Sequence, residues 1–413
     1  MSKKLQVLLL SSSMLVVVFA LIGGLGVHAS SSSSSADSSY SHMQVYSEVL
    51  HRIRTEYVEE PNMGSVTNGA LHGLLESLDA NSSYLTPAEF KAYQASKTDA
   101  KAGIGAVISK RFSYAAVVST TPNGPADKAG ISAGDILETV NGKSTHDLSL
   151  AAIRTQLLGE PGSRLEAVII RARKVEPQKL TIVREIVNPP AVQAQLMGEN
   201  VGYIKLQALT KGKAQEVASK IKDLQSKGAK KLVLDLRNNA EGDEDEGIAV
   251  ANLFLNKGLI SYLQGQRYPK ATFNADPEKK ITDLPVAVIV NRSTAGPAEI
   301  VAAALLDNSR ADVVGEKTFG EGSVQKVLDV PDGSALILSV AKYYTPKDKI
   351  IQDTGITPNV PVASGLDDVA AVTDDDSEVA PDEPQQQQTK PQQKEDDQLK
   401  KALDVLNRKN QKS

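Results

Sequence analysis

The chain has 413 residues, of which 41% are hydrophobic, and this length and composition predict two or three domains with apolar cores. The formal net charge is −4 and no long basic run occurs, which argues against nucleic acid as a partner. The absence of cysteine excludes disulfides, thiol catalysis, thiolate metal sites and a lipid-modified cysteine. The five histidines do not pair at metal-ligand spacing, so we predict neither a metal nor a cofactor.

Residues 1–29 have the pattern of a targeting segment. Lys3 and Lys4 precede a mostly apolar stretch from Leu5 to Val27, as in a signal peptide. The stretch is also long enough for an uncleaved membrane anchor, because about 20 apolar residues span a bilayer. Both alternatives predict an exported, periplasmic or otherwise extracytoplasmic protein that contacts the membrane only through this segment. The serine-rich residues 30–42 are predicted to form a flexible linker.

Residues 43–97 are predicted to form a helical N-terminal region, because their apolar residues recur at helical spacing. A loop is expected from Leu78 to Pro87, and Pro87 suits the start of a short helix.

Several glycine-containing motifs follow one another in residues 101–187. Gly103, Ile104, Gly105 and Ala106 open a predicted strand, and two turn-rich motifs follow. The two motifs span 123–130 and 131–142, a helix is predicted over 148–158, and strands are predicted over 165–173 and 180–185. In this order the motifs resemble those of a PDZ domain. The resemblance implies that backbone amides of residues 103–106 hold the carboxylate of a C-terminal peptide, which adds to the sheet as a strand. A PDZ domain kept only for packing is the alternative.

Strands and helices alternate through residues 195–365, which predicts an α/β core with right-handed crossovers. The expected strands are 201–206, 231–236, 286–291, 312–315 and 335–344, and the expected helices are 213–226, 242–255 and 298–307. The helix that begins near Gly242 has an acidic first turn, Asp243 to Glu246, which suits a helix N-terminus. A Ca²⁺ site is the weaker interpretation of this turn, because the spacing is not that of an EF-hand loop.

The chain ends with two segments of different character. Residues 366–394 are acidic and glutamine-rich, and we predict a disordered linker. Residues 395–410 have leucines on one helical face, which predicts a C-terminal helix that docks on the N-terminal helices or on a second subunit.

The stretch from Asn291 to Gln325 contains the most specific pattern. It reads as strand, loop, helix, strand and the glycine-rich turn Phe319-Gly-Glu-Gly322, and Pro297 suits the first helical position. This order resembles the active-site segment of the carboxyl-terminal processing (tail-specific) proteases, which are PDZ-containing serine peptidases with a Ser–Lys dyad. The resemblance implies an α/β protease core of the ClpP/crotonase type, an inserted PDZ domain, and helical N- and C-terminal segments.

The resemblance also implies where the reacting groups would lie. Aligned on Glu299 and Phe319, the position of the nucleophile falls on Gly296 and that of the general base on Glu321. Glycine offers no nucleophile, and a carboxylate is a weak base at neutral pH. The reacting groups of the dyad are therefore missing from a pattern that is otherwise present.

The implied oxyanion hole is also altered. One family donor is the amide of the residue after the nucleophile, here Pro297, which has no N–H. The other donor maps to Gly242, and the polar residues that support the family site map to Asp307 and Gln325. We therefore predict an inactive homologue that binds C-terminal tails, either as a homodimer or together with an active paralogue.

Other interpretations remain open. A relocated dyad could pair Ser293 or Thr294 with Lys317, which would make the chain an active endopeptidase. In a second interpretation, the carboxylates of Glu321 and Asp307 form a pair that activates a water molecule. A purely structural envelope protein is the third.

Overall fold

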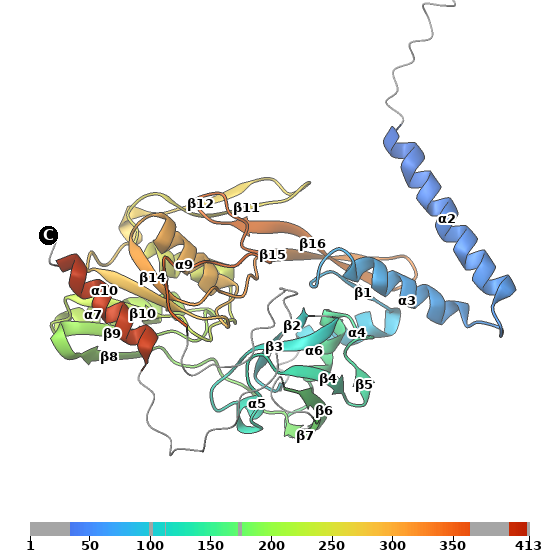
Figure 1. Cartoon of the computed structure of the whole chain (residues 1–413), viewed down its shortest axis with the longest axis horizontal. Coiled ribbons are helices and arrows are strands. Elements are labelled where there is room, and N and C mark those ends of the chain that lie inside the picture. The colour runs from blue at the N-terminus through green and yellow to red at the C-terminus, as the bar shows by residue number, and fades with distance from the viewer. Residues whose placement is uncertain (1–33, 99–101, 112, 172–175, 364–395, 411–413) are drawn as a thin grey trace, which may run out of the picture. The chain divides into compact units, whose positions relative to one another are not determined.

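The computed structural model describes residues 34–98, 102–111, 113–171, 176–363 and 396–410 (Figure 1). The predicted targeting segment and the predicted acidic linker lie outside the described residues. The chain divides into two compact units, one up to Asn68 and one from Gly69 onward, and each is described by itself. Among the described helices, none is both long enough and apolar enough to span a membrane.

The N-terminal unit contains helix α2 (Ser34–Glu56) and the start of helix α3 (Met63–Glu76). The prediction of a flexible linker over 30–42 is wrong from Ser34 onward, because these residues form the first turns of α2. Extending an existing helix costs far less free energy than nucleating one, so serine-rich residues can continue a helix that the following residues form.

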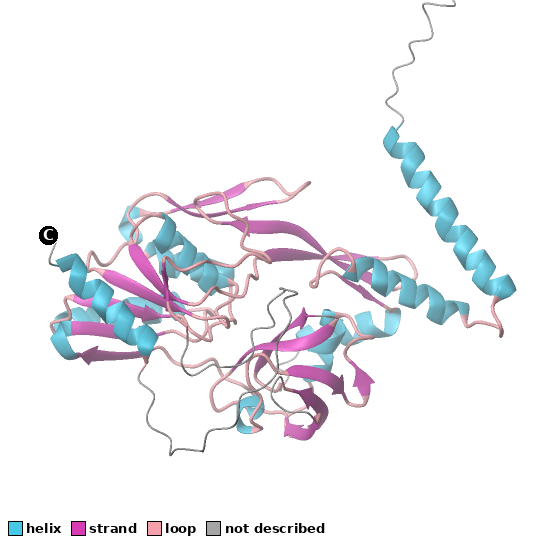
Figure 2. Cartoon of the chain, in the orientation of Figure 1, coloured by secondary structure: helices cyan, strands magenta, loops and turns pink. Residues whose placement is uncertain are grey.

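The second unit begins within α3 and contains a PDZ-like sheet of strand order β2-β3-β4-β6-β7, with β5 on β4. Figure 2 shows these strands in magenta, in the places that Figure 1 labels. Its elements are β2 (Ala106–Arg111), β3 (Tyr114–Thr120), α5 (Pro125–Lys128), β4 (Ile136–Val140), β5 (Lys143–Ser144), α6 (Leu150–Leu157), β6 (Arg164–Ile170) and β7 (Gln178–Val183). A buried apolar cluster that includes Ile108, Leu137 and Ile153 joins the sheet to α6. Strand β2 lies at the edge of the sheet, so one side of its backbone is available to a further strand.

The α/β core is a mostly parallel sheet of order β17-β14-β13-β10-β9-β8, in which only the β8–β9 pair is antiparallel. Its strands are β8 (Gln193–Met197), β9 (Val201–Lys205), β10 (Lys231–Asp235), β13 (Val286–Val290), β14 (Ala311–Gly315) and β17 (Val360–Pro361). A 3-10 turn, η1 (Gly198–Asn200), joins β8 to β9. Central strands of a parallel sheet are buried on both faces, which explains the continuous apolar run of β13.

Helices cover both faces of this sheet. The larger apolar core lies on one face, where alternate residues of the strands, such as Val288 of β13, meet three helices. These are α7 (Lys213–Ser226), α8 (Glu244–Asn252) and α9 (Pro297–Asp307). Helix α10 (Asp397–Asn410) buries Ala402 and Leu406 against the opposite face, beside Ile289. The α/β fold class predicted from the sequence is confirmed.

A second sheet extends from the core, with the order β1-β16-β11-β12 and β15 on β16. Its strands are β1 (Ser83–Leu85), β11 (Leu259–Gln264), β12 (Ala271–Asn274), β15 (Ser323–Asp329) and β16 (Ala335–Tyr344). Helix α4 (Pro87–Thr98) follows β1, and the 3-10 turn η2 (Pro277–Lys279) follows β12. The PDZ-like helix α6 packs against this sheet, because Ala152 shares a buried cluster with Leu85 and Ile337. Strand β1 lies where the sequence predicted only a loop.

Candidate active site and peptide groove

The loop that follows β13 is fixed by side-chain hydrogen bonds to the end of β10. Asn291 accepts the amide of Asn238 at 3.0 Å through Oδ1, and its Nδ2 donates to Asn238 Oδ1 at 2.7 Å. Thr294 Oγ1 donates to the carbonyl of Leu236 at 2.9 Å. These bonds determine where the loop delivers Gly296 to the start of α9.

Gly296 has a backbone conformation that favours glycine, with φ +61° and ψ −126°. A Cβ built on it would meet no described atom within 4 Å beyond its two chain neighbours. A small side chain would therefore have space here, although the positive φ would strain it. Pro297 is the first helical residue of α9, as predicted.

The buried carboxylate of Glu299 connects this loop to the glycine-rich turn. Its Oε2 accepts the amides of Gly296 at 3.0 Å and Glu321 at 2.7 Å, and its Oε1 accepts the amide of Gly320 at 2.8 Å. The hydroxyl of Thr318 also donates to Oε1. Burial raises the pKa of Glu299 to about 8, against the opposing effect of the four donors.

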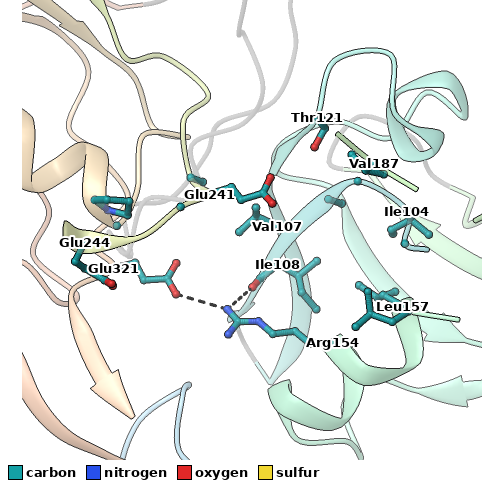
Figure 3. A pocket seen from close by; sticks show the side chains of 18 of the residues that line it. Ile104, Val107, Ile108, Thr121, Arg154, Leu157, Val187, Glu241, Glu244 and Glu321 are labelled. Atoms are coloured by element: carbon teal, nitrogen blue, oxygen red, sulfur yellow. Dashed lines mark hydrogen bonds and ion pairs between the residues drawn. The ribbon is translucent and has the colours of Figure 1, made fainter. Parts of the chain in front are cut away.

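Glu321 faces the PDZ-like domain. Its Oε1 lies 3.5 Å from Nη2 of Arg154 on α6, and the same Nη2 donates to the carbonyl of Ile108 at 3.0 Å (Figure 3). Arg154 thus bridges the edge strand β2 and the position that the resemblance assigned to the general base. No sequence motif indicated this pair.

Gly242 retains one feature of an oxyanion hole. Its amide has no hydrogen-bond partner among the described residues, and the residue lines the same cavity as Gly296. Its φ is +143°, and an added Cβ would lie 2.3 Å from the Leu209 carbonyl, so only glycine fits. Pro297 supplies no second donor beside it.

A cavity of about 510 Å³ joins the two domains of the second unit. One side is formed by Gly103, Ile104, Gly105 and Ala106, the residues predicted to bind a peptide carboxylate. The other side includes the four core positions Gly242, Gly296, Pro297 and Glu321, of which Glu321 is labelled in Figure 3.

The predicted carboxylate-binding loop has unpaired donors. The amides of Ile104 and Gly105 have no hydrogen-bond partner in the part of the chain that the structure describes. The loop itself is held in place, because the amide of Gly103 donates to the Glu185 carbonyl at 2.9 Å. Two adjacent free amides can bind a carboxylate.

Two further carboxylates, Glu241 and Glu244, line the core side of the cavity. Figure 3 shows Glu241 extending from the core towards Val107 of β2. Burial raises the pKa of Glu241, and burial together with neighbouring carboxylates, Glu321 among them, raises the pKa of Glu244. Glu246, which also belongs to the predicted acidic turn, instead accepts hydrogen bonds from the amides of Gly212 and Ala214 at the start of α7.

The predicted supporting residues separate in the structure. Gln325 lines the cavity, where its Nε2 donates to Ser323 Oγ at 2.8 Å. Asp307 lies at the other end of α9, about 16.5 Å from Gly296 at about 1.5 Å per residue, and accepts the amide of Lys347. The length of the helix therefore contradicts the alternative in which Asp307 and Glu321 act together on a water molecule.

The residues of the alternative dyad do not line the cavity. Thr294 is fully buried, and its hydroxyl already donates to the carbonyl of Leu236. Lys317 is exposed, and among the described residues it shares no hydrogen bond or ion pair with Ser293 or Thr294. No group of three or more potential metal ligands occurs within the described ranges.

Comparisons with known proteins identify relatives of both the α/β core and the PDZ-like domain. The model of peptidase family S41 matches residues 200–362, and a PDZ-domain model matches residues 117–171. The carboxy-terminal-processing protease of Bartonella bacilliformis is 34% identical over 80% of this chain and 77% of its own length. A carboxy-terminal processing protease of Bacillus subtilis is 31% identical over 82% and 72%, respectively. The solved photosystem II D1 C-terminal processing protease superposes with a TM-score of 0.65 at 26% identity, over 78% of this chain and 92% of its own.

Proposed function

The chain belongs to peptidase family S41, the PDZ-containing C-terminal processing peptidases, and from this premise we propose that it is an inactive member that binds C-terminal tails. It acts outside the cytoplasm as a scaffold or regulator, as a homodimer or beside an active paralogue. The targeting pattern of residues 1–29 supports the location, and the PDZ match supports the ligand class.

The observation that carries the proposal is the combination of Gly296, Pro297 and Glu321 around one cavity. A Ser–Lys dyad requires a hydroxyl and a lysine that can accept its proton. Here the first position has no side chain, and the second has a carboxylate that faces Arg154. One of two oxyanion donors is also replaced by proline, and a loss of this kind typically lowers the rate by about 10²–10³.

Peptide binding is supported by different residues. The unpaired amides of Ile104 and Gly105 lie at the end of the edge strand β2, which is where a C-terminal carboxylate and an added strand would bind. Leu157 lines the same part of the cavity and provides an apolar wall for the last side chain of the tail.

A peptidase assay on the purified full chain tests inactivity. Unfolded substrates with apolar C-termini should remain intact under conditions in which the Bacillus subtilis relative cleaves them. Turnover that is abolished by Ser293→Ala, Thr294→Ala or Lys317→Ala would instead support the relocated dyad.

Calorimetry tests binding separately. A peptide with a free C-terminus should bind, and the same peptide with an amidated C-terminus should bind at least tenfold more weakly, since amidation removes the negatively charged acceptor to which the two free N–H groups would donate. Equal affinities would refute the role of the carboxylate loop. No binding of either peptide would leave the structural envelope protein as the better interpretation.

A further inference from the structure

The cavity has a strong charge imbalance on the side that faces away from the carboxylate loop. Among the described residues that line it, three are carboxylates, Glu241, Glu244 and Glu321, and one is a cation, Arg154. The carboxylates belong to the core, and the cation comes from α6 of the PDZ-like domain.

Arg154 occupies a backbone group that an added strand would need. Ile108 pairs with Val117 of β3, but the Val117 amide donates to Asp135, away from β2. The backbone groups of Ile108 therefore face the free edge of β2. The carbonyl of Ile108 accepts Arg154 Nη2, so a tail that adds to β2 in register would displace the guanidinium.

Displacement has an electrostatic consequence. Arg154 is also the cation that faces Glu321, so its movement leaves three carboxylates beside the incoming tail. A tail with a lysine or arginine near these carboxylates would replace the lost partner. A neutral tail would leave them uncompensated, and an acidic tail would add repulsion.

Strand geometry limits where this cation can lie in the tail. Side chains alternate between the two faces of a strand, so the last residue and the second residue before it point into the groove near Ile104 and Leu157. The first and third residues before the last point away from the groove, towards the core. Glu241 extends from the core to this side of β2 (Figure 3).

We propose that the cavity selects C-terminal tails that combine an apolar last residue with a lysine or arginine at the first or third residue before it, bound by Glu241, Glu244 and Glu321. This inference rests on the proposed tail-binding function and specifies its ligand. The raised pKa values of Glu241 and Glu244 agree with it, because a bound cation would stabilise their charged forms.

Calorimetry on the full chain with synthetic hexapeptides tests the proposal. The reference is Ala-Ala-Lys-Ala-Ala-Leu, in which lysine is the third residue before the last, and the variants place lysine, methionine or glutamate in turn at the first, second, third and fourth positions before the last residue. We expect lysine at the first or third position before the end to bind about tenfold more tightly than glutamate there, and this ratio should shrink at high salt. Equal affinities for lysine, methionine and glutamate at every position would overturn the proposal.

Substitutions then locate the selectivity. Glu241→Gln with Glu244→Gln should bring the lysine and glutamate peptides within about threefold of each other, while the preference for a free over an amidated C-terminus stays. The matched control is Glu166→Gln with Glu278→Gln, which changes the net charge equally at two exposed sites outside the cavity. Selectivity that survives the first pair, or is lost in the control, would refute the assignment.

The two proposals fail in different ways. If no hexapeptide binds better than its amidated form, tail binding itself is wrong. If free C-termini are preferred but the first and third residues before the last have no influence on affinity, only the acidic selectivity is wrong. The peptide series on the unchanged protein shows which of the two proposals is wrong, even where a variant does not fold.

Discussion

The carboxylate of Glu299 accepts the backbone amide of Glu321 at 2.7 Å, across 22 residues of chain. The same oxygen accepts the amide of Gly296, so one buried group fixes both positions at which the family would react. Its protonation is therefore coupled to the stability of the site.

Stability should fall between about pH 5 and pH 8 because of Glu299. Its folded pKa, about 8, lies above the ordinary pKa of a glutamate side chain, about 4.3, so the folded state binds more protons than the unfolded state in this range. The free energy of unfolding then decreases with pH by up to about 1.4 kcal/mol per unit. Urea denaturation at several pH values measures this slope.

Glu299→Gln should flatten the pH dependence of the free energy of unfolding. At low pH the variant should be less stable by about 1–3 kcal/mol, because an amide cannot accept hydrogen bonds from all four donors. Glu278→Gln, at an exposed site, should keep the slope of the unchanged protein. A variant Glu299→Gln with the original pH dependence would show that this carboxyl does not titrate as described.

Restoring the reacting groups should restore little activity while Pro297 remains. Gly296→Ser has space for its side chain, and Glu321→Lys would place the amine beside Arg154, which lowers a lysine pKa towards that of a base. The double variant still lacks one oxyanion donor, so we expect weak turnover in the peptidase assay. Adding Pro297→Ala should raise the rate by about 10²–10³. A double variant that is already fully active would refute the oxyanion argument.

Arg154→Met should strengthen tail binding. The substitution frees the carbonyl of Ile108 for an added strand, and one net hydrogen bond corresponds to about fivefold in affinity. It also removes the partner of Glu321, so the lysine hexapeptide should gain more than the methionine hexapeptide. Arg164→Met, on the exposed surface of β6, is the control. Weaker binding of both peptides would mean that Arg154 contributes to the groove instead of blocking it.

Leu406→Ala should destabilise the protein by about 2–5 kcal/mol, because Leu406 is fully buried between α10 and the core sheet. Arg237 of the core donates two hydrogen bonds to Asp396, directly before α10, so the start of the helix should stay attached to the core in the variant. Asp404→Asn, at an exposed site on α10, should change the free energy of unfolding by less than about 0.5 kcal/mol. Equal stabilities of the two variants would show that α10 does not dock as described.

Local sequence patterns predicted much of the core. The helix over Lys213–Ser226 and the strand over Ala335–Tyr344 have the predicted bounds, because their periodicity and their end signals coincide. Strand β1 was missed, since its three residues form a strand only by pairing with β16, as in Ser83 with Ile337. Such a pairing depends on tertiary structure and leaves no local signal.

The candidate site was predictable only in part. Motif spacing identified Gly242, Gly296 and Glu321, which the structure brings to one cavity. The pairing of Arg154 with Glu321 depends on the docking of α6 against the second sheet, and no motif reports that contact. The distance of Asp307 from the cavity was not predicted, because matching a family position gives residue identity but not which end of α9 faces the cavity.

The contacts of Glu299 with Gly296, Gly320 and Glu321 involve only main-chain N–H groups of those residues. Main-chain donors are the same for every amino acid except proline, so this anchoring does not depend on which side chains occupy the two reacting positions. Substitutions that remove or restore catalytic side chains at these two positions would therefore leave the backbone around the cavity in place during evolution.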